Sequence, residues 1–99
     1  MDNVARNEIL DLGRKAHDLT ESLYRKDSSK RGDPTWPDKQ RILLADMALH
    51  LLQTALREGD LPEADLKRNL FSILTISEQL MPGHELKKVA DQLYIPQQA

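Results

Sequence analysis

Histidines with nearby carboxylates are the residues of this chain best suited to bind a metal ion or to catalyse a reaction. Asp46 and His50 stand four residues apart, so on a helix they would share a face and could both ligate one metal ion. A catalytic site at this pair would need a third polar group from another helix. We interpret the pair instead as part of a solvated polar stripe or as a local hydrogen bond, and His17, which precedes Asp18, as part of a solvated face. We therefore expect no bound metal and no other cofactor.

Other catalytic patterns are missing from the sequence. The chain has no cysteine, which excludes thiolate nucleophiles, thiolate metal ligands and disulfides. Its serines do not stand on strand–turn–helix elbows, and its four glycines are too far apart to form a phosphate-binding loop. We therefore expect a protein that is not an enzyme and has no small-molecule substrate.

Basic residues in and around residues 25–41 leave a nucleic-acid-associated regulator as the alternative function. In that case Arg25, Lys26, Lys30 and Arg31 would contact phosphates. Aspartates in the same segment offset part of this charge, and a net charge of −2 gives no general attraction to nucleic acid. Nucleic-acid binding is thus the less favoured interpretation.

Helical periodicity predicts four helices and no strand. The expected helices cover residues 3–25, 35–58, 60–81 and 83–93. The second and third are joined by a turn of about two residues at Gly59, so they should form an antiparallel hairpin. The pattern predicts an all-α fold, a small helical bundle of three long helices plus one short C-terminal helix. Residues 26–35 are expected to form an exposed loop and residues 96–99 a flexible tail.

Capping residues mark the expected start of the second and third helices. Thr35 can cap the second helix, with Pro37 in its first turn. Asp60 is expected to cap the third, with Pro62 in its first turn.

The first helix carries a narrow apolar seam. Its members follow the alternating four-and-three spacing of a coiled coil: Ala5, Ile9, Leu12, Ala16, Leu19 and Leu23. A seam of this width is expected to pack against one or two neighbouring helices. Gly13 costs the helix up to about 1 kcal/mol relative to alanine, and close approach of another helix is one explanation for its presence.

The second helix is apolar around most of its circumference, which is more than a small bundle can enclose. A second chain would complete the enclosure. We therefore expect a small adaptor or regulatory protein that acts through protein–protein association with another protein or, most simply, as a homodimer, since a twofold axis lets one face serve both subunits. The residues expected at the contact are Leu43, Met47 and Phe71, with Trp36 at its rim.

Length and composition bound the remaining possibilities. The 99 residues correspond to a single helical domain spanning residues 1–99. No apolar run approaches the roughly 18–20 residues of a membrane span, and the polar N-terminal segment does not resemble a signal peptide. We expect a soluble cytoplasmic protein that makes no membrane contact.

Overall fold

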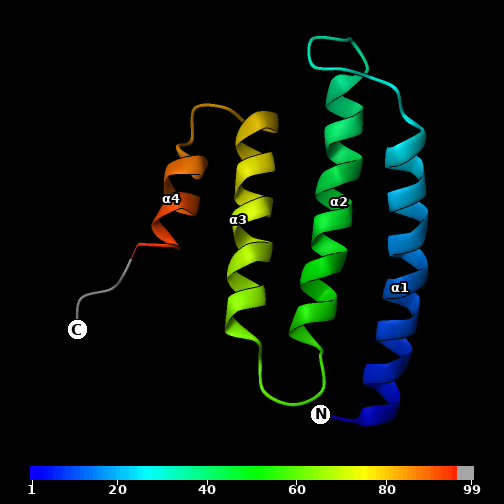
Figure 1. The fold of residues 1–99 in the computed structure, drawn as a ribbon. Coiled ribbons are helices and arrows are strands. Elements are labelled where there is room, and N and C mark those ends of the chain that lie inside the picture. The colour runs from blue at the N-terminus through cyan, green and yellow to red at the C-terminus, as the bar shows by residue number, and fades with distance from the viewer. Residues whose placement is uncertain (96–99) are drawn as a thin grey trace.

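The computed structural model describes residues 1–95, which form four α-helices and no strand (Figure 1). The helices are α1 (Asn3–Lys26), α2 (Trp36–Ala55), α3 (Glu63–Leu80) and α4 (Leu86–Gln92). The predicted all-α fold, with three long helices and a short C-terminal one, is confirmed, and α2 and α3 form the antiparallel hairpin. The predicted tail at residues 96–99 lies outside the described residues.

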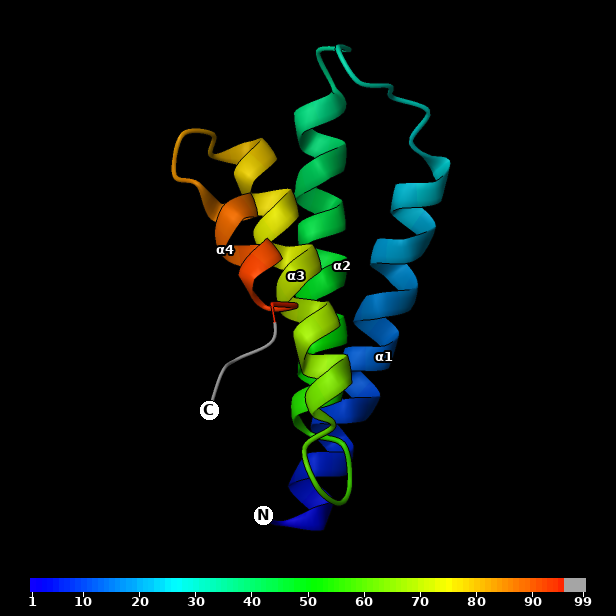
Figure 2. The same cartoon turned by 60° about the vertical axis from the view of Figure 1, so that its left-hand side comes forward.

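The helices lie side by side in chain order and make an open bundle (Figures 1 and 2). Within residues 1–95, α1 contacts α2, α2 contacts α3 and α3 contacts α4, and no other pair of helices touches. The Cα atoms extend over 44 × 41 × 16 Å, with a radius of gyration of 15.5 Å. A compact chain of this length has a radius of gyration of about 13 Å. The bundle is therefore flat, and α2 is flanked by helices on only two sides.

This arrangement leaves the chain with almost no buried core. Among the described residues only Ile76 and Ala90 are buried apolar residues, and no large side chain is fully enclosed. The accessible surface is 7272 Å² for a mass of 11.3 kDa. A folded monomer of that mass normally exposes about 5,700 Å². The single chain thus exposes on the order of 1,500 Å² more than a compact monomer does.

No helix within residues 1–95 combines the length and the apolar character that a membrane crossing requires.

The connection between α2 and α3 is longer than predicted and covers residues 56–62. Helix α3 begins at Glu63 with Pro62 at its N-cap position and no side-chain cap, so the prediction that Asp60 caps this helix is wrong. A proline disfavours helical geometry in the residue before it, here Leu61. The helix therefore starts only after the proline.

Residues 27–35 form the predicted loop between the first two helices. This loop makes several hydrogen bonds of its own. The N–H of Ser29 donates to Asp27 Oδ1 at 2.8 Å, and Lys39 Nζ donates to the Ser29 carbonyl at 3.3 Å. Hydrogen bonds from the side chain and backbone of Ser29 lower the pKa of the Asp27 carboxyl. Thr35 occupies the predicted N-cap position of α2, but its hydroxyl bonds to the Ser29 hydroxyl and makes no cap bond.

Helix α4 is attached to α3 by a carboxylate and an aromatic pair. Glu78 accepts hydrogen bonds from the backbone N–H groups of Leu86 at 2.6 Å and Gly83 at 2.9 Å. These two bonds lower the pKa of the Glu78 carboxyl, and the bond from Leu86 has the larger effect. The rings of Phe71 and Tyr94 meet edge to face with centroids 5.4 Å apart. Phe71 thus packs within the chain, on the side of α3 that faces α4.

Candidate functional site

Helix α1 contacts α2 through a row of residues next to the predicted apolar seam. Each member of this row comes one position after a member of the seam in the sequence. This row is buried or half-buried and consists of Arg6, Leu10, Gly13, His17, Thr20 and Tyr24. It has the same four-and-three spacing as the seam, and its members lie about 100° further around the helix. The prediction that the seam packs on a neighbouring helix is therefore wrong for a single chain, because a partly polar row takes that position.

Gly13 allows the two helices to approach closely. A Cβ atom added to Gly13 would lie 2.9 Å from Cδ2 of Leu52, which is too short for an undisturbed contact between carbon atoms. The explanation of Gly13 by close helix–helix contact is thus confirmed.

Three ligand-bearing side chains meet in the α1–α2 interface, and we call them the polar cluster: His17, Asp46 and His50. The two Nε2 atoms of His17 and His50 are 2.9 Å apart. His17 Nε2 lies 3.4 Å from Asp46 Oδ1, and His50 Nε2 lies 3.5 Å from Asp46 Oδ2. The exposed fractions of the side chains of His17, Asp46 and His50 are 16%, 9% and 40%. The interpretation of Asp46 and His17 as solvated is therefore wrong, because the row facing α2 buries both.

Two neighbouring side chains support the polar cluster. The Thr20 hydroxyl donates to Asp46 Oδ1 at 2.6 Å, and Glu21 Oε2 lies 3.7 Å from His17 Nδ1. A buried carboxylate is costly unless hydrogen-bond donors satisfy it. Thr20 therefore satisfies one oxygen of the Asp46 carboxyl within the interface, and Glu21 lies on the Nδ1 side of His17.

The apolar seam of α1 is exposed to solvent. The exposed fractions of Leu12 and Leu19 are 66% and 72%, and Leu23 and Ile9 are also exposed. A second row on α2 has four-and-three spacing too and consists mostly of small side chains: Ala45, Ala48, Leu52 and Ala55. Its three alanines are exposed and Leu52 is half-buried. We call these two rows together the apolar face.

Both rows lie on the same side of the bundle. The α1–α2 interface has one edge where Gly13 meets Leu52 and another where His17 meets His50. On the circumference of α1, Gly13 lies between His17 and the seam. On α2, Leu52 is itself a member of the alanine-rich row. The apolar face is therefore on the Gly13 side of the interface, away from the polar cluster.

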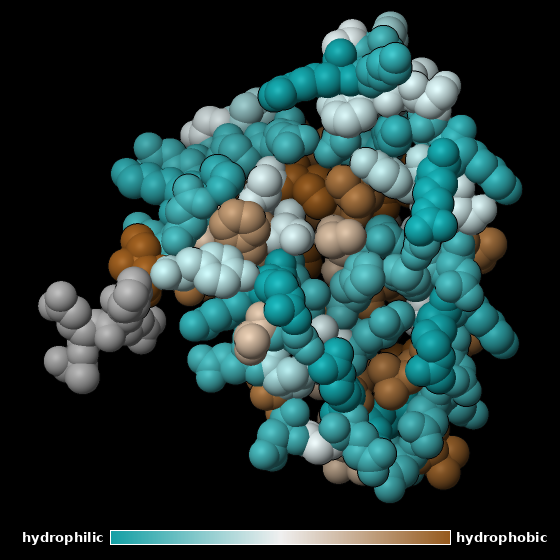
Figure 3. Space-filling model, in the orientation of Figure 1, coloured by the Kyte–Doolittle hydropathy of each residue, from teal (hydrophilic) through white to brown (hydrophobic). Residues whose placement is uncertain are grey.

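Figure 3 shows one broad face of the bundle. Hydrophilic side chains cover most of this face, and hydrophobic atoms are gathered mainly in recesses near its middle. On this face the hydrophobic atoms are therefore largely surrounded by hydrophilic side chains.

The four residues predicted at a protein contact are all half-buried. Leu43 and Met47 lie one turn apart on α2, and Trp36 is the first residue of that helix. Phe71 packs against Tyr94 on the other side of α3. The structure does not bring the four together, and a contact through them stays a prediction.

The basic residues of the alternative function lie at one end of the bundle. Arg25 pairs with Glu21 at 2.6 Å, which offsets its charge. Lys26 ends α1, and Lys30 and Arg31 are exposed in the connection that follows. The phosphate-binding role of these residues stays a prediction.

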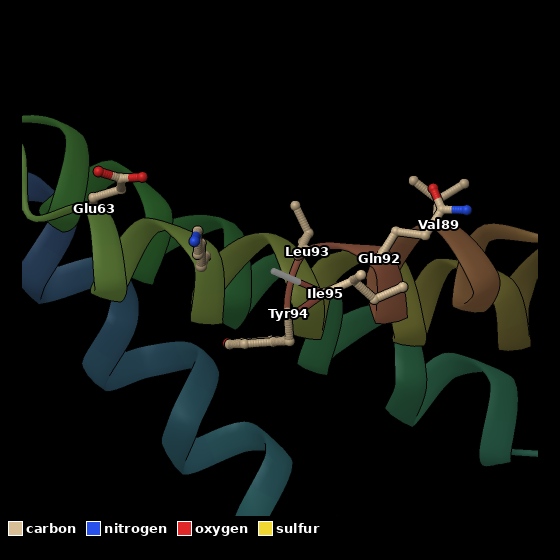
Figure 4. A pocket seen from close by; sticks show the side chains of 7 residues that line it. Glu63, Val89, Gln92, Leu93, Tyr94 and Ile95 are labelled. Atoms are coloured by element: carbon tan, nitrogen blue, oxygen red, sulfur yellow. The ribbon is translucent and has the colours of Figure 1, made fainter. Parts of the chain in front are cut away.

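A hollow of about 560 Å³ lies between α3 and the C-terminal part of the described chain (Figure 4). Its lining consists of Glu63, Lys67, Val89, Gln92, Leu93, Tyr94 and Ile95. Glu63 and Val89 lie at opposite ends of the hollow in Figure 4. The ionisable residues of the lining are Glu63, Lys67 and Tyr94, and the lining includes no histidine or serine.

The sequence matches no protein-family model, and no curated protein or solved structure shows significant similarity to it. Function must therefore be inferred from the residues and their geometry.

Proposed function

We propose that this chain acts through protein–protein association, as a homodimer in which the apolar faces of two copies cover each other. Its role in this proposal is that of a small adaptor or regulator with no catalysis of its own. The observation that supports it best is the exposure of the leucine seam of α1 in a chain without a buried core. Leucines at a coiled-coil spacing are stable when a facing helix covers them.

The exposed area is of the size that a stable dimer buries. Each copy exposes on the order of 1,500 Å² more than a compact monomer does, and part of this excess is the apolar face. Obligate homodimers bury roughly 2,000–5,000 Å² and are apolar at their contact. Crystal-type or transient contacts bury much less.

The apolar face is complementary to itself, which favours a second copy over a different protein. Its α1 row is a ridge of protruding leucines, whereas its α2 row is a shallow line of alanines with Leu52 among them. Under a twofold axis, the ridge of each copy can pack across the alanine row of the other. Both halves of the contact are then equivalent, and no apolar row is left uncovered.

Single-cysteine variants test this proposal without interference, because the chain has no cysteine of its own. Ala48→Cys places a thiol in the middle of the α2 row, and Ala64→Cys places one at an exposed position of α3 outside the apolar face. The proposal predicts that alkylation of Cys at position 48 slows as the protein concentration rises, while alkylation at position 64 does not change. Equal and concentration-independent rates at both positions would contradict it.

A further inference from the structure

The polar cluster presents three ligand atoms with the spacing of a metal site. Four ligands placed tetrahedrally at about 2.0–2.1 Å from zinc are separated from one another by about 3.3 Å. In the cluster the two Nε2 atoms are 2.9 Å apart, His17 Nε2 lies 3.4 Å from Asp46 Oδ1 and His50 Nε2 lies 3.5 Å from Asp46 Oδ2. One ligand atom from each of the three residues lies within 4.8 Å of the other two. An ion could therefore contact His17, Asp46 and His50 after only small shifts of the side chains.

We propose that His17, Asp46 and His50 bind a divalent transition-metal ion, with zinc as the best match. Imidazole nitrogens suit zinc, copper, iron and nickel, whereas magnesium and calcium prefer sites made of oxygen atoms alone. Three protein ligands leave the fourth tetrahedral position for water. The sequence alone places only Asp46 and His50 together. The third ligand, His17, comes from α1.

The ligands are held by further contacts, as in established metal sites. A metal-bound histidine usually donates its other ring N–H to a carboxylate or carbonyl, and a ligating carboxylate is usually hydrogen-bonded as well. Here Glu21 Oε2 lies 3.7 Å from Nδ1 of His17, and Thr20 donates to Asp46 at 2.6 Å. The Thr20 hydrogen bond holds the carboxylate at the cluster, and Glu21 lies on the side of the His17 ring opposite Nε2.

The cluster is also accessible from solvent on one side. His50 is the most exposed of the three ligands, and it lines a polar hollow of about 320 Å³. The other lining residues are Thr54, Arg57, Asp65, Arg68 and Asn69. An ion could enter through this hollow, and water there could occupy the fourth position.

The competing explanation is a hydrogen-bonded network without metal. Two neutral imidazoles can share one proton between their Nε2 atoms at 2.9 Å, but the two nitrogens and the carboxylate are all acceptors unless protonated. A cation at their centre would contact both nitrogens and the carboxylate at once, whereas the network without metal relies on Thr20 as the donor to Asp46.

The test is zinc binding to the chelator-treated protein, measured by isothermal titration calorimetry with zinc chloride and by the visible spectrum of added cobalt(II). We expect one zinc per chain, a melting temperature that rises with zinc concentration, and a cobalt spectrum of tetrahedral type. The variants are His50→Gln, chosen because His50 is the most exposed ligand, and Asp46→Asn. Each should weaken zinc binding at least about tenfold, with far-UV circular dichroism confirming its fold in the absence of metal.

His84→Gln is the matched control, because His84 is exposed and lies outside the cluster. It should bind zinc as the unmodified chain does. The proposal is overturned if the unmodified chain binds no zinc, or if a folded His50→Gln variant binds zinc as tightly as the His84→Gln control. The apolar face lies on the other side of the α1–α2 interface, so neither result depends on whether the chain forms a dimer.

Discussion

Truncation of one exposed leucine measures what the apolar face contributes to association. Leu19→Ala removes three carbons, worth about 2.4 kcal/mol if the side chain is fully transferred from water. Leu19 is 72% exposed in the single chain, so a partner that covers it would supply about 1.7 kcal/mol of that transfer free energy per copy. A symmetric dimer contains two copies of the variant side chain and loses about 3 kcal/mol of association free energy in total. This raises the dimer dissociation constant by a factor of about 100 or more.

Sedimentation equilibrium over a concentration series provides the dissociation constants of the parent chain and of the Leu19→Ala variant. Leu61→Ala is the matched control, because Leu61 is 54% exposed but lies in the α2–α3 connection. We expect the control to change the constant by less than about threefold, as is usual for a surface position. Equal constants for Leu19→Ala and Leu61→Ala would refute the assignment of the seam to the contact.

Three further predictions concern contacts within the chain. Gly13→Leu should lower the free energy of unfolding by about 1–3 kcal/mol, because even a Cβ at this position would lie 2.9 Å from Leu52; an unchanged thermal unfolding curve would contradict this. Thr20→Val should cost about 1–3 kcal/mol in urea unfolding, because the buried Asp46 carboxylate loses its donor; a loss below about 0.5 kcal/mol would show that water replaces the hydroxyl. The pKa of Glu78 is lowered from its ordinary value of 4.5, so its stabilisation of α4 is fully present above pH 4.5 and is lost as the pH falls through the lower pKa. The amide chemical shift of Leu86 should therefore titrate with a midpoint below 4.5, and a midpoint at or above 4.5 would contradict the assigned hydrogen bonds.

The fold could be predicted because the helices depend on signals within short stretches of the sequence. The four-and-three spacing of apolar residues from Ala5 to Leu23 and the proline and glycine punctuation around residues 56–62 define the helices and their order. Asp60 is a good capping residue and therefore predicts a start of α3 that is too early. The conformational restriction that Pro62 imposes on Leu61 prevailed over this capping preference.

The complete polar cluster could not be predicted, because His17 comes from α1 whereas Asp46 and His50 both lie on α2. His17 and His50 are 33 positions apart, and no local spacing indicates which face of α1 lies against α2. Apolar periodicity favours the seam that contains Leu12 and Leu19, whereas the row that faces α2 is one residue further on and includes Gly13. The signal that could have indicated this row is the glycine itself, since a buried glycine within a helix is typical of a close helix crossing.

The solution mass of the purified chain, measured by size-exclusion chromatography with multi-angle light scattering, tests the central claim most directly. The exposed leucine seam and the missing core predict a particle of twice the chain mass of 11.3 kDa. A folded, monodisperse particle of 11.3 kDa across the accessible concentration range would contradict the homodimer, and the apolar face would then have to be covered in another way.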